Sequence, residues 1–181
     1  MRNFALALML TATPALATGI EIDVAGQADG TIVIDLFEDI APGHAERITI
    51  LAERDAYDNV VFHRVIDGFM AQTGDVEFGK MGGDMRMAGS GGSDMPDLAL
   101  EASAGSFQRG MVGMARSQNR DSANSQFFIM LEPAPHLNGQ YTIVGRVTEG
   151  LDVLDAIKKG TGANGAVVGE PDRMVDMRVT P

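Results

Sequence analysis

The 181-residue sequence contains no cysteine, no tryptophan and only three histidines, His44, His63 and His136. The absence of cysteine excludes disulfide bonds, thiolate metal sites and a cysteine nucleophile. The histidines are too few and too scattered in the sequence to indicate a metal site. A G-x-S-x-G nucleophile motif, an H-E-x-x-H zinc motif and a phosphate-binding loop are also missing. The common signatures of hydrolytic, metal-dependent and nucleotide-dependent enzymes are therefore absent.

Basic residues are also scarce, because 14 lysines and arginines stand against 25 acidic residues and the formal net charge is -11. We expect no nucleic-acid partner, since such binding needs clustered lysine and arginine against phosphates. The same excess of acid disfavours docking on an anionic membrane surface. A hydrophobic content of 45% and a charged content of 22% are typical of a folded domain, and the length fits one such domain.

The N-terminal residues have the pattern of a secretory signal peptide. Arg2 supplies a short positive region, residues 4–12 form a mainly apolar stretch, and residues 15–17 (A-L-A) form a small-x-small cleavage site. The apolar run is shorter than the ~20 residues that span a bilayer. We therefore predict a signal peptide at 1–17 and a mature domain at 18–181, exported to the periplasm of a bacterial cell and free of the membrane after processing. A buried N-terminal helix is the alternative.

Short segments of alternating polarity dominate the rest of the chain, and they predict strands rather than long helices. Segment 79–96, rich in Gly, Ser, Asp and Met, predicts a long loop. Hairpin-type spacing favours an antiparallel barrel over β-α-β units. We expect strands at 20–24, 31–37, 60–66, 69–73, 98–102, 111–115, 126–131, 141–147 and 173–179, and helices at 43–54, with His44 facing solvent, and at 151–159.

Three segments carry dense combinations of polar and aromatic residues. Residues 61–75 read V-F-H-R-V-I-D-G-F-M-A-Q-T-G-D, residues 113–116 and 122–129 read G-M-A-R and S-A-N-S-Q-F-F-I, and residues 136–147 read H-L-N-G-Q-Y-T-I-V-G-R-V. Together they resemble the cyclophilin family of peptidyl-prolyl cis-trans isomerases, with residues 114–125 similar to its bacterial exported branch. The resemblance, which covers about residues 20–179, implies a mainly β fold: a closed eight-stranded antiparallel β-barrel capped by two α-helices.

The implied activity agrees with the missing signatures. Rotation about an X–Pro bond makes and breaks no covalent bond, so it needs no nucleophile, metal or cofactor. A catalyst must instead prefer the twisted amide, whose prolyl nitrogen regains a lone pair that a fixed guanidinium can bind. Arg64 is the matching family residue, and Gln72 is expected to hold it in place. One hydrogen bond from a charged donor accelerates the reaction by roughly 10–100-fold, so an apolar pocket must supply the rest of the rate enhancement.

The resemblance also implies the remaining site residues. It implies Arg64, Gln72 and Phe69 as catalytic residues, with no metal and no cofactor. The substrate-binding residues that it implies are Met70, Ala115, Arg116, Gln126, Phe128, His136, Leu137 and Tyr141. Each has a plainer alternative: Arg64 as a surface arginine paired with an acid, the apolar residues as ordinary core, and the glutamines as polar residues of a barrel rim. We expect Asp75 to be a turn or network acid and His63 a structural group.

Two positions depart from the eukaryotic members of the family. Many of them carry tryptophan immediately before the residue that matches Leu137, where this chain has His136, and histidine where this chain has Tyr141. We therefore expect weak or no cyclosporin binding, because an indole donor and its large apolar face are lost. The expected partners are proline-containing segments of unfolded or exported proteins, and we expect a monomer.

Two other functions remain open from the sequence. The same domain is also compatible with a peptide-binding chaperone or scaffold in which turnover is incidental. Segment 79–96 contains Met81, Met85, Met87 and Met95, and thioether sulfurs of this kind bind Cu(I) in exported proteins. A flexible loop with adaptable apolar contacts is the plainer interpretation of these methionines.

Overall fold

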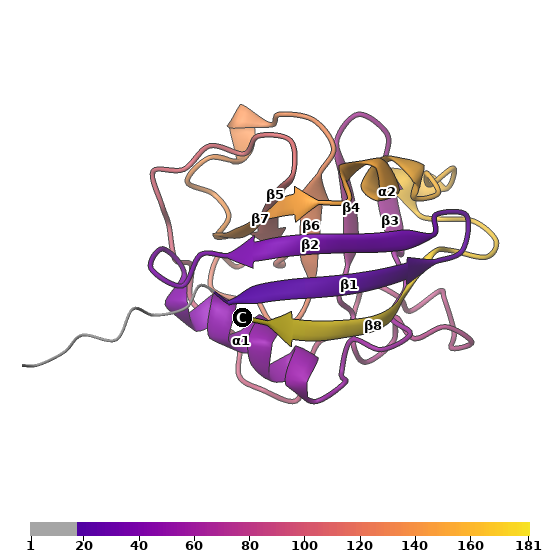
Figure 1. The fold of residues 1–181 in the computed structure, drawn as a ribbon, viewed down its shortest axis with the longest axis horizontal. Helices are drawn as coiled ribbons and strands as arrows, with labels where there is room; N and C mark the ends of the chain where they lie inside the picture. The colour runs from indigo at the N-terminus through magenta and orange to yellow at the C-terminus, as the bar shows by residue number, and fades with distance from the viewer. Residues whose placement is uncertain (1–17) are drawn as a thin grey trace, which may run out of the picture.

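The computed structural model describes residues 18–181 and contains eight strands and two α-helices (Figure 1). The predicted signal peptide, 1–17, lies outside the described residues. The elements in chain order are β1 (Gly19–Ala25), β2 (Gly30–Leu36), α1 (Pro42–Glu53), β3 (Arg64–Ile66), β4 (Met70–Thr73), β5 (Met111–Met114), β6 (Phe127–Met130), the 3-10 helix η1 (Pro135–Leu137), β7 (Ile143–Glu149), α2 (Leu151–Ala156), the 3-10 helix η2 (Ala163–Gly165) and β8 (Arg173–Thr180).

The strands form one antiparallel sheet in the order β3-β4-β6-β5-β7-β2-β1-β8, curled into an open half-barrel. The prediction of a mainly β fold with eight antiparallel strands and two helices is confirmed, but the prediction of a closed barrel is wrong. β3 and β8 are the two ends of the sheet, and the chain near them meets only at an isolated bridge between Val61 and Arg173.

A separate stretch of chain occupies the free side of β3 and explains why the barrel stays open. Residues 160–167, here called the edge segment, include η2. The N–H of Gly160 donates to Val65 O at 2.8 Å, the N–H of Val167 donates to His63 O at 3.0 Å, and Ala166 forms a bridge with Arg64. Because these groups already use the outer edge of β3, β8 cannot add to it as a strand.

The two faces of the sheet are covered by different material, and β6 shows this most clearly. Phe127 and Ile129 belong to the larger core inside the half-barrel, whereas Phe128 and Met130 belong to a second cluster on the opposite face. All four residues of β6 are consequently buried. The second cluster also contains Phe107, and it forms the floor of the site described below.

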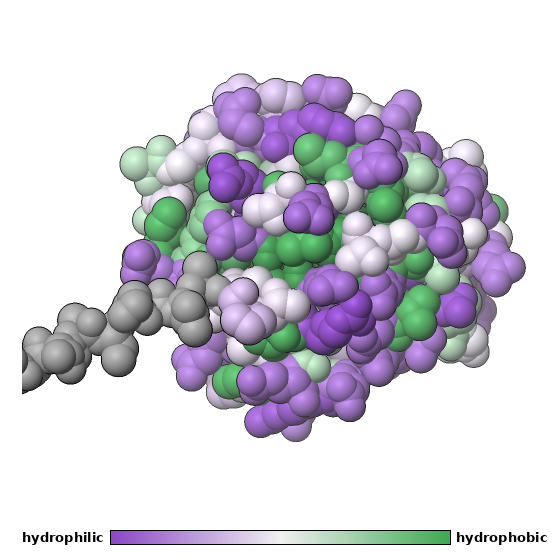
Figure 2. Space-filling model, viewed as in Figure 1, coloured by the Kyte–Doolittle hydropathy of each residue, from purple (hydrophilic) through white to green (hydrophobic). Residues whose placement is uncertain are grey.

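At the other end of the sheet the outer face is charged. The inward residues of β1, such as Ile20 and Ile22, enter the larger core. The alternate residues Glu21 and Asp23 point outward and pair with Arg178 of β8. Figure 2 shows hydrophilic residues over this part of β1 and β8. The alternation that predicted these strands thus separates core from solvent along them.

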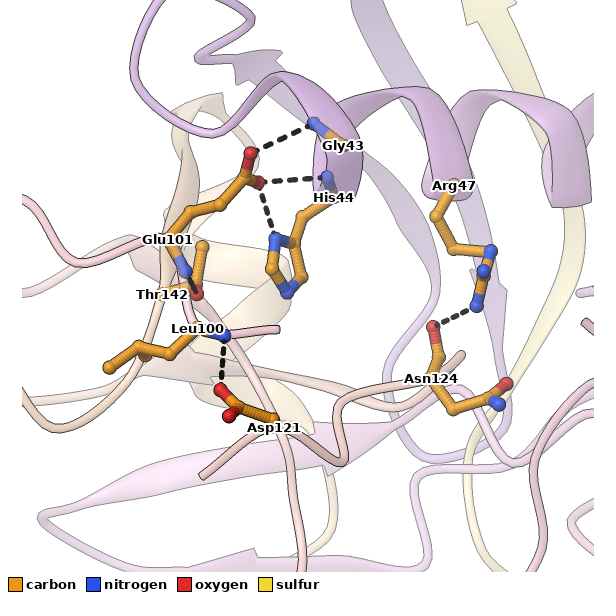
Figure 3. Close-up of polar contacts among 8 residues, drawn as sticks. All are labelled: Gly43, His44, Arg47, Leu100, Glu101, Asp121, Asn124 and Thr142. Atoms are coloured by element: carbon orange, nitrogen blue, oxygen red, sulfur yellow. Dashed lines mark hydrogen bonds and ion pairs between the residues drawn. The ribbon is translucent and has the colours of Figure 1, made fainter. Parts of the chain in front are cut away.

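Helix α1 fastens the long connection between β4 and β5 to the domain (Figure 3). It has no side-chain cap of its own, and Glu101 accepts hydrogen bonds instead from the N–H groups of Gly43 and His44 and from the His44 ring. His44 is wholly buried, so the expectation that it faces solvent is wrong. Arg47, only 4% exposed, donates to Pro96 O at 2.7 Å.

The predicted strand at 98–102 is absent, because its main chain is engaged by side chains instead of a neighbouring strand. The N–H of Leu100 donates to Asp121 Oδ1 at 2.9 Å, and the N–H of Glu101 donates to Thr142 Oγ1 at 3.0 Å. Only Leu98 forms a bridge, with Ala123. Helix α2 is also shorter than predicted and ends at Ala156.

Asp75 organises the start of the same connection, as expected for a network acid. Its wholly buried carboxylate accepts four main-chain N–H groups. Those of Glu77 and Phe78 donate to Oδ1, and those of Gly89 and Gly91 donate to Oδ2 at 2.7 and 3.0 Å. One side chain therefore holds both ends of a loop of about 16 residues.

We expect Asp75→Asn to lower the free energy of unfolding by about 3 kcal/mol, because an amide NH2 cannot accept the Gly89 and Gly91 hydrogen bonds. Urea denaturation measures this change. Asp84→Asn is the matched control, since Asp84 lies exposed in the same loop and pairs only with Arg86. Equal stability of the two variants would contradict the role of Asp75.

His63 links stability to pH. Burial lowers its pKa from 6.5 to about 4; Asp75 opposes this shift and Arg64 reinforces it. The unfolded chain therefore binds a proton near pH 6.5 that the folded chain takes up only near pH 4. Since the unfolded state binds more protons in this window, stability falls as the pH drops through it.

We expect the titration of His63 to lower the free energy of unfolding by up to about 3 kcal/mol between pH 6.5 and pH 4. His63→Gln should flatten the profile in this window, as measured by urea denaturation at several pH values. The exposed His136→Gln serves as the control and should retain the wild-type slope. An unchanged slope in His63→Gln would refute the assignment.

Candidate active site

Strand register brings three residues from two of the sequence motifs into one row. Arg64 of β3 lies directly opposite Gln72 of β4, and Gln72 lies opposite Phe128 of β6. Side chains at paired positions of antiparallel strands share a face of the sheet. Arg64, Gln72 and Phe128 therefore stand side by side, although Phe128 is more than 50 residues from the other two in the sequence.

A chain of hydrogen bonds orients the Arg64 guanidinium. Its Nη1 donates to Gln72 Oε1 at 3.1 Å, Gln72 Nε2 donates to Gln126 Oε1 at 3.0 Å, and Gln126 Nε2 donates to Gly91 O at 2.8 Å. Each amide is fixed by the next, and the last contact is to the loop that Asp75 holds. The expected contact between Gln72 and Arg64 is thus present.

A hollow of about 170 Å³ opens beside this guanidinium. It is smaller than the roughly 300–1,000 Å³ of pockets that hold drug-sized ligands, and it suits one compact side chain. Its lining residues all belong to the predicted site: Arg64, Phe69, Met70, Gln72, Ala115, Arg116, Phe128, Leu137 and Tyr141.

Aromatic packing shapes the floor of the hollow. The Phe128 ring stacks on Phe107 and meets the edge of Tyr141, with ring centroids 5.6 Å apart in both pairs. Gly113, paired with Phe128 across the strands, leaves room for both phenylalanines, because a Cβ there would lie 2.4 Å from Phe128 Cζ. Phe128 is 5% exposed, so it is both core and pocket floor, as is Met70.

The rim carries a second guanidinium. The Arg116 Cζ atom lies 4.3 Å from the centroid of the Tyr141 ring, a cation–π contact. Its Nε and Nη2 donate to Gln140 O at 3.2 and 3.1 Å. Arg116 therefore fixes the position of Tyr141 at the mouth of the hollow.

The main-chain N–H of the neighbouring Ala115 already donates to Gln126 O at 2.9 Å.

Two predicted site residues do not line this hollow. His136 lies on the outer side of Phe69, with ring centroids 5.8 Å apart. Gln126 lies behind Gln72 and lines an adjoining hollow of about 510 Å³, whose walls include residues 89–93 and 115–117. The sequence motifs thus identified the small hollow and its support, but not the larger space beside it.

Arg64 keeps its charge unpaired. No acidic side chain of residues 18–181 forms an ion pair with it, so the alternative of a surface arginine paired with an acid does not describe this side chain. Burial lowers the pKa of Arg64 below its usual range, and Tyr141 opposes this effect. The guanidinium remains protonated at neutral pH all the same. Apart from Gln72, it donates to Asn164, which the sequence motifs did not identify.

Comparisons with known proteins agree with this architecture. The family model described as "Cyclophilin type peptidyl-prolyl cis-trans isomerase/CLD" matches residues 20–179. A "Probable peptidyl-prolyl cis-trans isomerase" of Brucella suis biovar 1 is 54% identical over 149 residues, covering 81% of this chain and 76% of the relative. Peptidyl-prolyl cis-trans isomerase B of Bacillus subtilis is 35% identical over 130 residues, covering 71% and 84%.

A crystal structure of a cyclophilin type peptidyl-prolyl cis-trans isomerase from Cryptosporidium parvum shares the fold. Its TM-score is 0.76 at 23% sequence identity, with 92% of this chain and 99% of that chain covered. The sequence match over residues 20–179, together with the shared fold, shows that this chain belongs to the cyclophilin-type peptidyl-prolyl cis-trans isomerase family.

Proposed function

We propose that this protein isomerises X–Pro bonds by presenting the Arg64 guanidinium to the twisted amide while the prolyl ring occupies the small hollow. Membership of the isomerase family supports the activity itself. One observation supports the mechanism: an unpaired, oriented positive charge lies at the wall of a hollow whose other walls include Phe69, Met70 and Leu137.

The chemistry needs only a preference for the transition state. Rotation about the amide bond must overcome about 18–20 kcal/mol because it breaks C–N conjugation. In the twisted amide the nitrogen regains a lone pair, and Arg64 donates to it. A charge-assisted hydrogen bond contributes roughly 1.5–3 kcal/mol. The apolar walls exclude water from the bond, which strengthens this contact and holds the proline in place.

The substrate is an extended proline-containing segment that lies beside residues 115–116. Because the N–H of Ala115 is already paired, the peptide uses other main-chain groups there. Arg116 and Tyr141 border its path at the mouth of the hollow. Binding of this kind also underlies the alternative function, a chaperone or scaffold that holds peptides and turns them over incidentally.

We further propose that the protein belongs to the exported branch of the family and acts on exported proteins in the periplasm. The support is the signal-peptide pattern of residues 1–17 and the sequence of residues 114–125. Within residues 18–181, none of the helices has the length and apolar character needed to cross a membrane.

Arg64→Ala should lower kcat/KM by roughly 10–100-fold on an Ala-Pro peptide in a protease-coupled assay, because it removes the charged donor. The kcat/KM of Arg64→Lys should lie between those of the wild type and Arg64→Ala, since lysine keeps the charge but lacks the planar guanidinium. Arg109→Ala is the control, because Arg109 pairs with Asp155 outside the site. Full activity in Arg64→Ala would refute the mechanism, and peptide binding without turnover in the wild type would favour the chaperone.

Cyclosporin should bind weakly, with a Kd in the micromolar range or above, because the exposed imidazole of His136 offers less apolar area than an indole. We expect His136→Trp to tighten binding by roughly tenfold, equivalent to about 1.4 kcal/mol. Isothermal titration calorimetry measures both values, with His136→Phe to separate ring area from the indole N–H. A nanomolar Kd for the wild type would contradict this prediction.

A further inference from the structure

The guanidinium of Arg64 is held from a second side, by the edge segment. Its Nε donates to the main-chain carbonyl of Asn164 at 2.9 Å, and its Nη2 lies 3.4 Å from Asn164 Oδ1. Gln72 takes Nη1. Each of the three guanidinium nitrogens therefore has a protein acceptor, and the plane of the group is fixed.

The carbonyl of Asn164 reaches Arg64 because of an unusual main-chain conformation. Asn164 has φ 57° and ψ 26°, in the left-handed region, inside the short helix η2. Asparagine adopts this region at lower cost than most residues with a Cβ. The neighbouring Gly165 packs tightly against β3, since a Cβ there would lie 2.3 Å from Ile66 Cγ1.

The open half-barrel makes this contact available. Because β8 does not cover the free side of β3, the edge segment docks there through Gly160 and Val167. It thereby brings a residue 100 positions from Arg64 into contact with its side chain. Asn164 is absent from the lining of the hollow, so it contacts Arg64 and not the bound proline.

We propose that Asn164 is a positioning residue, which aims the guanidinium of Arg64 into the hollow and leaves its charge unneutralised. The inference rests on the proposed role of Arg64. Both acceptors on Asn164 are neutral, in a chain with 25 acidic residues. A carboxylate in this place would form a charge-assisted pair with the guanidinium and compete with the amide nitrogen of the substrate.

Three substitutions separate the parts of this role. Asn164→Gly keeps the left-handed conformation and the carbonyl contact but loses Oδ1, so kcat/KM should stay within about threefold of wild type. Asn164→Val disfavours the left-handed region and displaces the carbonyl, and kcat/KM should fall by roughly tenfold. Asn164→Asp keeps the shape of the side chain and adds a negative charge, and its kcat/KM should also fall by roughly tenfold.

The loss should appear in kcat while the Kd of a proline peptide, measured by calorimetry, stays within about twofold, because Asn164 does not line the hollow. Asn59 provides the matched control, since it also has a left-handed conformation, with φ 59°, but lies outside the site. Asn59→Val should cost comparable stability, measured by urea denaturation, and leave kcat unchanged.

A double variant tests whether Asn164 acts through Arg64. In the Arg64→Ala background, Asn164→Val should lower kcat/KM no further. Two outcomes would overturn the proposal, provided that Arg64→Ala still impairs activity. One is that Asn164→Val lowers kcat/KM in the Arg64→Ala background as much as it does in the wild type. The other is a wild-type kcat in both Asn164→Val and Asn164→Asp. Full activity in Arg64→Ala would instead refute the proposed function on which the inference rests.

Discussion

The site depends on one arginine whose charge is oriented by neutral groups. Arg64 contacts an amide oxygen of Gln72 and two oxygens of Asn164, and none of these neutralises it. The chain has 25 acidic residues, yet no carboxylate among residues 18–181 pairs with Arg64. Neutral dipoles fix the guanidinium without competing for its charge, and a preorganised charge in a partly dry site stabilises a developing lone pair more strongly than it would in water.

The shape of the sheet supports this arrangement from both sides. Because the half-barrel is open, the outer side of β3 accepts the edge segment, and the inner side pairs with β4. Because β6 is buried on both faces, Phe128 rests on a second apolar cluster and not on the main core. The floor of the hollow is therefore packed independently of the half-barrel interior.

The loops around the site are held by buried polar groups. Asp75 gathers four N–H groups of one loop, and Glu101 and Arg47 attach the following stretch to α1. Buried groups of this kind are costly to leave unpaired, so they specify a single loop arrangement. The Gly91 carbonyl that ends the hydrogen-bond chain from Arg64 is set in this way.

The sequence by itself determined the strands of β1 and β2 and the family motifs whose residues line the small hollow, because local periodicity and motif chemistry depend on neighbouring residues. It predicted a strand at 98–102 where side chains from distant segments take the main-chain groups. Only the tertiary structure decided that the barrel stays open and that Asn164 meets Arg64. Both outcomes depend on which segment docks along the free edge of β3, and the segment that does so lies about 100 residues from Arg64 in the sequence, a contact that no local pattern records.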